Sequence, residues 1–219
     1  MAETVPIFPL SHVLLPGATL PLHIFERRYR YLLDDIADGV HRSAFGVVAI
    51  RRGSETSATA DFAPVGTMAE IVEQEPHPDG SCDLLTVGSR RFEVIVVDRT
   101  TKPYLQATVD WLEEDDGNVV PGLLAACRAL CRSYEQALTG LSGRTPPSDY
   151  PLDPMRLSYE IAGRLQVQSS DRQDLLAAAT AADRLTACLT MLRRETTLLE
   201  QTRTVPIAMQ ALRIVPSSN

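Results

Sequence analysis

The apolar residues of this 219-residue chain change their spacing near residue 115. Before that point they occur in short runs separated by Gly, Pro and Asp, and after it they recur at helical spacing. An acidic stretch without apolar residues, 113–118, lies between the two parts. The sequence therefore predicts an α+β chain with a β-rich domain over residues 1–114, a helical domain over 115–204 and a C-terminal tail over 205–219.

Strand patterns dominate the first part. Five segments are strand candidates: 45–50, 65–73, 82–87, 92–97 and 104–111. Strict alternation over 104–111 indicates one buried face, whereas the β-branched run 92–97 favours a strand covered on both sides. The Asp79-Gly80 pair predicts a hairpin turn, and one helix is expected over 26–37. Closely spaced strands with so few helices favour a mostly antiparallel barrel or sandwich.

The second part predicts roughly four helices, which would form a small bundle. Their expected ranges are 121–138, 154–165, 170–179 and 183–199. Asp153 and Pro154 provide an N-cap and a proline at the first helical position. Ser170 and Gln173 match the spacing of a capping box, in which each side chain covers a free backbone amide.

Charge and motif content exclude several function classes. The chain has 21 Lys and Arg against 28 Asp and Glu, a net charge of −7, which disfavours binding to the phosphates of a nucleic acid. No P-loop is present, and Lys102 is the single lysine, so nucleotide hydrolysis through that motif is excluded. The sequence provides no catalytic residues of a recognised type, and we expect no enzyme activity.

The metal-ligating residue types are scattered. The four histidines, His12, His23, His41 and His77, are far apart in sequence, and Cys127 with Cys131 reads as two small core residues. The prediction is therefore no metal and no cofactor. With no export signal and no long apolar segment, we expect reduced thiols, a cytoplasmic location and no membrane association.

Three features allow a binding role or a structural one. Adjacent arginines such as Arg90-Arg91 suit either an anion clamp or internal ion pairs. His23 with Glu26 suits either a peptide anchor or a fixed corner between a strand and a helix. The string Leu14-Leu15-Pro16-Gly17 would form either an exposed apolar ledge or part of the core.

Several strings together resemble the N-terminal substrate-binding domain of the Lon protease family. They are VPIFPLSHVLLPGATLPLHIFERRYRYLLDDI at 5–36, FGVVAI at 45–50 and VGTMAEIVEQEPHPDGSCDLLTVGSRRFEV at 65–94. The later segment 157–199 is similar to the helical extension of that family, so the resemblance covers nearly the whole chain.

The resemblance implies a PUA-like antiparallel β-barrel followed by an α-helical bundle. It implies a stand-alone, non-enzymatic module that recognises unfolded or extended polypeptide, without the ATPase and peptidase modules of a full Lon protease, as an adaptor beside a protease or chaperone. The residues carried over to a peptide-binding surface are His23, Phe25, Glu26, Tyr29 and Arg91. RNA binding by the PUA-like barrel, or small-ligand binding, is the alternative, and the oligomeric state stays open.

Overall fold

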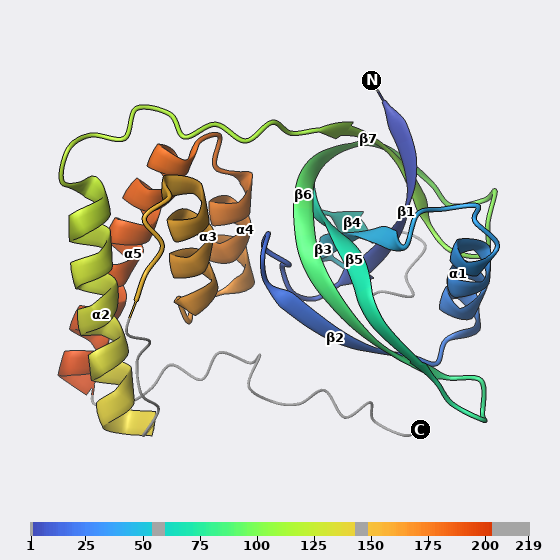
Figure 1. Cartoon of the computed structure of the whole chain (residues 1–219), viewed down its shortest axis with the longest axis horizontal. Coiled ribbons are helices and arrows are strands. Elements are labelled where there is room, and N and C mark those ends of the chain that lie inside the picture. Colours follow the sequence, from blue (N-terminus) through green and yellow to red (C-terminus); the bar gives the residue numbers. More distant parts are fainter. Residues whose placement is uncertain (1, 54–59, 143–148, 203–219) are drawn as a thin grey trace. The chain divides into compact units, whose positions relative to one another are not determined.

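The computed structural model describes residues 2–53, 60–142 and 149–202, and it divides into two compact units. These are Met1–Glu113, which holds the strands, and Glu114–Asn219, which holds four of the helices (Figure 1). Each unit is described by itself. The tail predicted over 205–219 lies outside the described residues.

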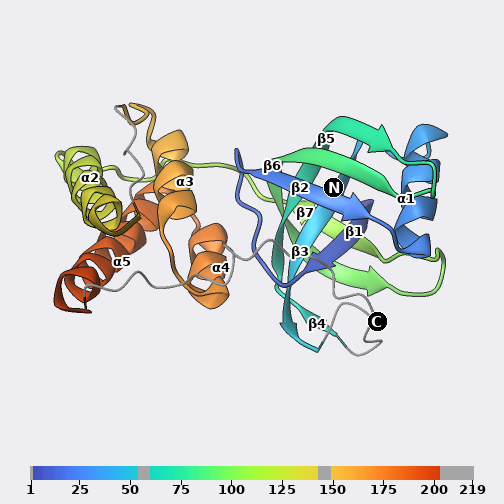
Figure 2. The same ribbon diagram turned by 90° about the horizontal axis from the view of Figure 1, so that it is seen from below.

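The first unit is built on one mostly antiparallel sheet. Its elements are β1 (Glu3–Leu10), β2 (Thr19–Ile24), α1 (Arg27–Ala37), β3 (Ala44–Arg52), β4 (Asp61–Phe62), β5 (Val65–Pro76), β6 (Cys82–Asp98) and β7 (Gln106–Trp111). Hydrogen bonds connect β1, β7, β6, β5 and β3 in that order, and β3 pairs again with β1, in parallel. The series of paired strands therefore begins and ends at β1. Strand β2 lies outside this series and pairs with β6 (Figure 2).

Helix α1 covers one of two apolar clusters found among the described residues of this unit. Its buried residues include Tyr29 and Leu32, and the Tyr29 ring stacks on Phe8 of β1 at 3.9 Å between centroids. The second cluster surrounds Phe92 of β6, which is fully buried. The helical spacing of apolar residues in α1 is thus explained by one face packed against the sheet.

The Leu14-Leu15-Pro16-Gly17 string enters the core, where Leu14 and Leu15 are 4% and 1% exposed. The loop after it is fastened to β6, because the Gly17 N–H donates to the Gly88 carbonyl and the Gly88 N–H donates to the Ala18 carbonyl, at 2.8 and 2.9 Å. Gly17 has a φ of +79°, which a side chain would disfavour. Leu14 and Leu15 therefore form part of the core, and the turn at Gly17 is exposed.

Two strand predictions are wrong in their details. The segments 82–87 and 92–97 belong to one continuous strand, β6, because residues of the intervening Gly88–Arg91 also pair with β5. The run 92–97 is covered on one side only: Ile95 and Val96 are 51% and 60% exposed. A β-branched run therefore indicated strand conformation here, but not burial.

The second unit contains α2 (Leu123–Ser142), α3 (Pro154–Arg164), α4 (Ser169–Ala177) and α5 (Ala181–Thr202). Helix α5 packs against the other three. Cys127 and Cys131 of α2 are fully buried, which confirms their interpretation as core residues, and all four cysteines are free thiols. Among the described residues, no helix is both long and apolar enough to cross a bilayer.

The helix starts agree only in part with the predicted caps. Asp153 accepts a hydrogen bond from the Arg156 N–H at 2.7 Å, so the predicted N-cap of α3 is confirmed. The predicted Ser170 capping box is wrong, because α4 begins at Ser169 and its N-cap residue makes no side-chain cap bond. At α5 the hydroxyl of Thr180 accepts from the Asp183 N–H instead.

Candidate functional site

The end of β2 and the start of α1 present three of the predicted site residues. The His23 side chain is 47% exposed, Phe25 is 49% exposed, and Glu26 forms an ion pair of 2.9 Å with Arg28. Within the described residues β2 pairs only with β6, so this corner lies at a sheet edge. An exposed phenylalanine at such an edge is available for contact with another molecule.

A surface hollow of about 440 Å³ adjoins this corner. It is lined by Phe25, Arg27, Arg30, Tyr31 and Asp34. Arg27 donates a hydrogen bond to the Tyr31 hydroxyl at 2.9 Å, and its guanidinium lies 5.5 Å from the centre of that ring. The hollow therefore combines two exposed aromatic rings with charged groups of both signs.

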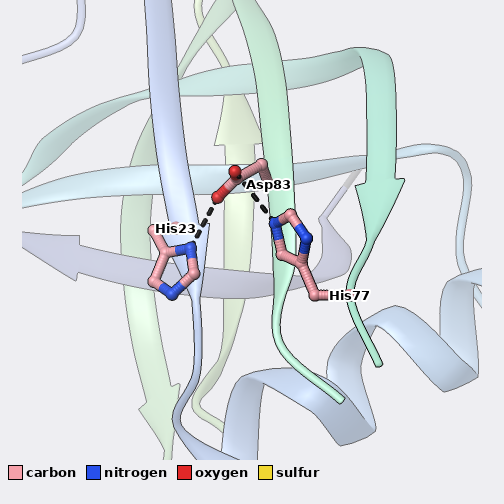
Figure 3. Close-up of side chains that lie close together, drawn as sticks. All are labelled: His23, His77 and Asp83. Atoms are coloured by element: carbon pink, nitrogen blue, oxygen red, sulfur yellow. Dashed lines mark hydrogen bonds and ion pairs between the residues drawn. The ribbon is translucent and has the colours of Figure 1, made fainter. Parts of the chain in front are cut away.

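His23 also belongs to a polar cluster that the sequence did not predict. The Asp83 carboxylate lies between the imidazoles of His23 and His77 (Figure 3), at 2.5 Å from His23 Nδ1 and 3.0 Å from His77 Nε2. His23 and Asp83 are register partners on β2 and β6, and His77 follows the end of β5. The pairing of β2 and β5 with β6 thus joins residues that are distant in sequence.

The cluster shifts the pKa values of its members in opposite directions. The hydrogen bond to Asp83 raises the pKa of His77, while the hydrogen bonds from His23 and then His77 lower the pKa of Asp83. In the turn, hydrogen bonds from Ser81 lower the pKa of Asp79. The charged pair of His77 and Asp83 is therefore favoured in the folded chain.

We expect His77 to titrate above the ordinary histidine pKa of 6.5, and Asp83→Asn to return it toward that value. Because the folded pKa is raised, the pair's contribution to stability is fully present below the unfolded pKa and disappears as pH rises through the folded one. The chemical shifts of the imidazole carbon-bound protons, followed by NMR as a function of pH, measure the pKa of His77. Asp38→Asn, which removes an equal charge from the end of α1, is the control. A His77 pKa at or below 6.5 in the wild type would contradict the hydrogen bond.

Burial corrects the assignment of two predicted residues to a contact surface. Tyr29 and Arg91 are each only 2% exposed. Tyr29 packs on Phe8, and the Arg28 guanidinium lies 4.5 Å from the centre of its ring. Their motif positions are therefore explained by the fold, and His23, Phe25 and Glu26 remain as surface residues.

Another polar cluster fastens α1 to the connection between β6 and β7. Asp35 accepts hydrogen bonds from Lys102 at 2.8 Å and from the Tyr104 hydroxyl at 2.5 Å. His41 lies 2.9 Å from the same hydroxyl. The bond from Lys102 contributes most to lowering the pKa of Asp35, and burial lowers that of His41. The ammonium group of Lys102 pairs with the Asp35 carboxylate, and we interpret this cluster as structural.

Arg90 lies beside a cavity of about 380 Å³. Its guanidinium lies 4.5 Å from the centre of the Trp111 ring, and Trp111 donates a hydrogen bond to Glu3 at 3.0 Å. Of the arginine pair, Arg90 thus stacks on an aromatic ring while Arg91 is buried. The two members do not form a shared, exposed anion clamp.

Comparison of the chain with known protein families agrees with the resemblance found in its sequence. The family model for the ATP-dependent protease La (LON) substrate-binding domain matches residues 4–194. The chain belongs to this family. That match includes β2, α1 and the β5–β6 hairpin, so every residue of the corner and its cluster lies within the LON substrate-binding domain.

Lon proteases are among the relatives of this LON substrate-binding domain chain. "Lon protease 2" of Syntrophobacter fumaroxidans is 27% identical over 80% of this chain and 22% of the relative. "Lon protease" of Parabacteroides distasonis is 35% identical over 52% of this chain and 14% of the relative. The chain thus spans less than a quarter of the length of these two curated relatives.

Solved structures share the fold. A crystal structure described as a Lon N-terminal domain protein from Xanthomonas campestris has a TM-score of 0.66 and 28% identity, covering 86% of this chain and 98% of that one. The N-terminal domain of the Mycobacterium avium complex Lon protease has a TM-score of 0.60 at 15% identity, over 87% and 98%. The sheet and the helices described above therefore form the Lon N-terminal domain fold.

Proposed function

We propose that this chain is a non-catalytic module that binds unfolded or extended polypeptide. The observation that carries the proposal is the match of residues 4–194 to a substrate-binding domain. Within it, we assign the closed strand path to a PUA-like barrel and α2–α5 to a helical bundle. We place the module in the cytoplasm, as an adaptor that presents polypeptide to a protease or chaperone.

We assign the contact surface to the corner of β2 and α1, with His23, Phe25 and Glu26. Phe25 and Tyr31 are 49% and 39% exposed on the hollow, and aromatic side chains contribute much of the affinity of protein interfaces. The guanidinium of Arg30 and the carboxylate of Asp34 supply polar partners at the same hollow for backbone groups of an extended chain.

The chemistry of β2 favours recognition by side chains over addition of a new strand. A polypeptide that extends a sheet needs backbone donors along the edge strand. Pro21 lies in the middle of β2, is exposed, and has no N–H to donate. We therefore expect a bound segment to place apolar side chains against Phe25 and the hollow.

Fluorescence anisotropy with a labelled polypeptide tests the proposal. The labelled polypeptide is a disulfide-bonded protein used in two forms. We expect saturable binding of its reduced, carboxymethylated form, which is unfolded, and markedly weaker binding of its native form. A second titration with labelled single-stranded RNA should show no binding at physiological salt, because the chain carries a net charge of −7. Saturable RNA binding, or equal affinity for folded and unfolded forms, would contradict a module selective for unfolded polypeptide.

A further inference from the structure

We propose that His23, His77 and Asp83 form a binding site for one divalent late first-row transition metal ion, with Zn²⁺ as the reference ion. Two imidazole nitrogens and one carboxylate oxygen form a donor set typical of zinc sites that keep an open position. The donor atoms of the three residues all lie within 4.8 Å of one another.

The distances require only a small adjustment. With bonds of about 2.0–2.2 Å, two ligands of a tetrahedral zinc ion lie about 3.3 Å apart. The present contacts involve different oxygens of the Asp83 carboxylate, at 2.5 Å from Oδ1 to His23 Nδ1 and 3.0 Å from Oδ2 to His77 Nε2, and the two imidazole donors lie within 4.8 Å of each other. All three side chains are partly exposed, at 47%, 32% and 52% for His23, His77 and Asp83, so they can rotate to reach that spacing, which changes no donor separation by more than about 1.5 Å.

The backbone beneath the ligands is held by regular structure. His23 and Asp83 face each other on paired strands. The turn that carries His77 is closed by two hydrogen bonds, from the His77 N–H to the Ser81 carbonyl at 2.8 Å and from the Gly80 N–H to the His77 carbonyl at 3.0 Å. Gly80 adopts a φ of +80°, as this turn requires. Ligands on paired strands and a closed turn are suited to fixed coordination.

The surrounding charge favours a cation. Glu75 is the register partner of Asp83 on β5, and Asp79 lies in the turn. Arg30 is the opposing charge, and its guanidinium lies 3.4 Å from the backbone carbonyl of Asp79. The Asp35 cluster offers a useful contrast, since Lys102 already supplies a cation to its carboxylate. At the His23 cluster the carboxylate is shared by two imidazoles instead.

Metal binding would replace each hydrogen bond between histidine and aspartate by a bond from the ring nitrogen to the ion. The ion takes neutral imidazoles and an ionised carboxylate, so a ring in the imidazolium form releases one proton to solvent, while a neutral ring keeps its single N–H on the nitrogen that does not bind the ion. Three protein ligands leave one tetrahedral position for water. The four cysteines are buried, so their thiols are less accessible to a metal ion than the side chains of His23, His77 and Asp83.

Calorimetric titration of the untagged, chelator-treated chain with Zn²⁺ tests the site. We expect one ion per chain, and a loss of affinity of more than about 100-fold for His23→Gln combined with His77→Gln, because the loss of two ligands exceeds the effect of an outer-shell change. Asp83→Asn should weaken binding by about 10-fold or more. The matched control is His12→Gln, which replaces a histidine outside the cluster and should bind as the wild type does.

A second readout separates ligand loss from unfolding. Circular dichroism of the metal-free variants should match that of the wild type, because all three side chains are on the surface. Co²⁺ should give visible absorption bands of a nitrogen- and oxygen-ligated site in the wild type and not in the double variant. Absence of 1:1 binding, or unchanged affinity in the double variant, would overturn the proposal and leave the cluster as a hydrogen-bonded clasp between β2 and the hairpin.

Discussion

Replacement of Gly88 with alanine is expected to lower the free energy of unfolding of the first unit by about 3 kcal/mol, the upper part of the range for overpacked interiors. A Cβ at this position would lie 2.3 Å from the backbone carbonyl oxygen of Leu15. Leu15 is 1% exposed, and the loop that follows it is hydrogen-bonded to both the N–H and the carbonyl of Gly88. The loop therefore cannot move away from an added Cβ without breaking these bonds.

Urea unfolding followed by tryptophan fluorescence measures this effect, because the single tryptophan, Trp111, lies in β7 of the same unit. Gly163→Ala in α3 is the control for adding a Cβ, and because α3 lies in the second unit its unfolding is followed by far-ultraviolet circular dichroism. An added Cβ there meets nothing within 4 Å, and the higher helix propensity of alanine should leave stability unchanged or raise it by up to about 1 kcal/mol. An unchanged midpoint for Gly88→Ala would show that the loop packs against β6 less closely than described.

Replacement of Arg184 with leucine is expected to destabilise the second unit by about 3–5 kcal/mol. The side chain is fully buried in α5 and donates hydrogen bonds to the Leu175 carbonyl, the Ser158 hydroxyl and the Ala178 carbonyl, at 2.8, 2.9 and 3.2 Å. Its guanidinium also lies 3.9 Å from the centre of the Tyr159 ring. Leucine fills part of the volume but leaves these buried oxygens without that donor.

Far-ultraviolet circular dichroism during urea unfolding follows this change, since the second unit holds four of the five helices in the part of the chain that the structure describes. Arg193→Leu is the matched control, because it makes the same substitution at an exposed position of the same helix. We expect the control to change stability by less than about 0.5 kcal/mol. Equal effects of the two substitutions would mean that the buried hydrogen bonds of Arg184 contribute nothing.

The motif Gly-x-x-Arg-Phe at 88–92 illustrates what the sequence could predict. Its family resemblance correctly identified the fold, yet its three defined residues lie inside the first unit. Gly88 admits the Leu15 carbonyl, Arg91 is buried, and the Phe92 ring occupies the space where Gly66 has no side chain. A Cβ at Gly66 would lie 2.5 Å from that ring. The sequence pattern therefore identified the family without distinguishing buried residues from those on a binding surface.

The polar cluster shows what local patterns could not predict. His23 and His77 are on different strands or turns, and only the pairing of β2 with β6 and of β6 with β5 brings both to Asp83. The spacing of histidines in sequence gave no indication of a ligand set, because long-range register determines it. A local signal existed only for the hairpin, whose Asp79-Gly80 turn places His77 near Asp83.

The central claim, binding of extended polypeptide at the corner of β2 and α1, is tested most directly by comparing Phe25→Ala with Val96→Ala in the anisotropy titration. Both residues are exposed apolar side chains, at 49% and 60%, but only Phe25 lines the hollow. We predict that Phe25→Ala weakens binding of the unfolded polypeptide by about tenfold or more, while Val96→Ala binds as the wild type does. Wild-type affinity in the Phe25→Ala chain would contradict the account.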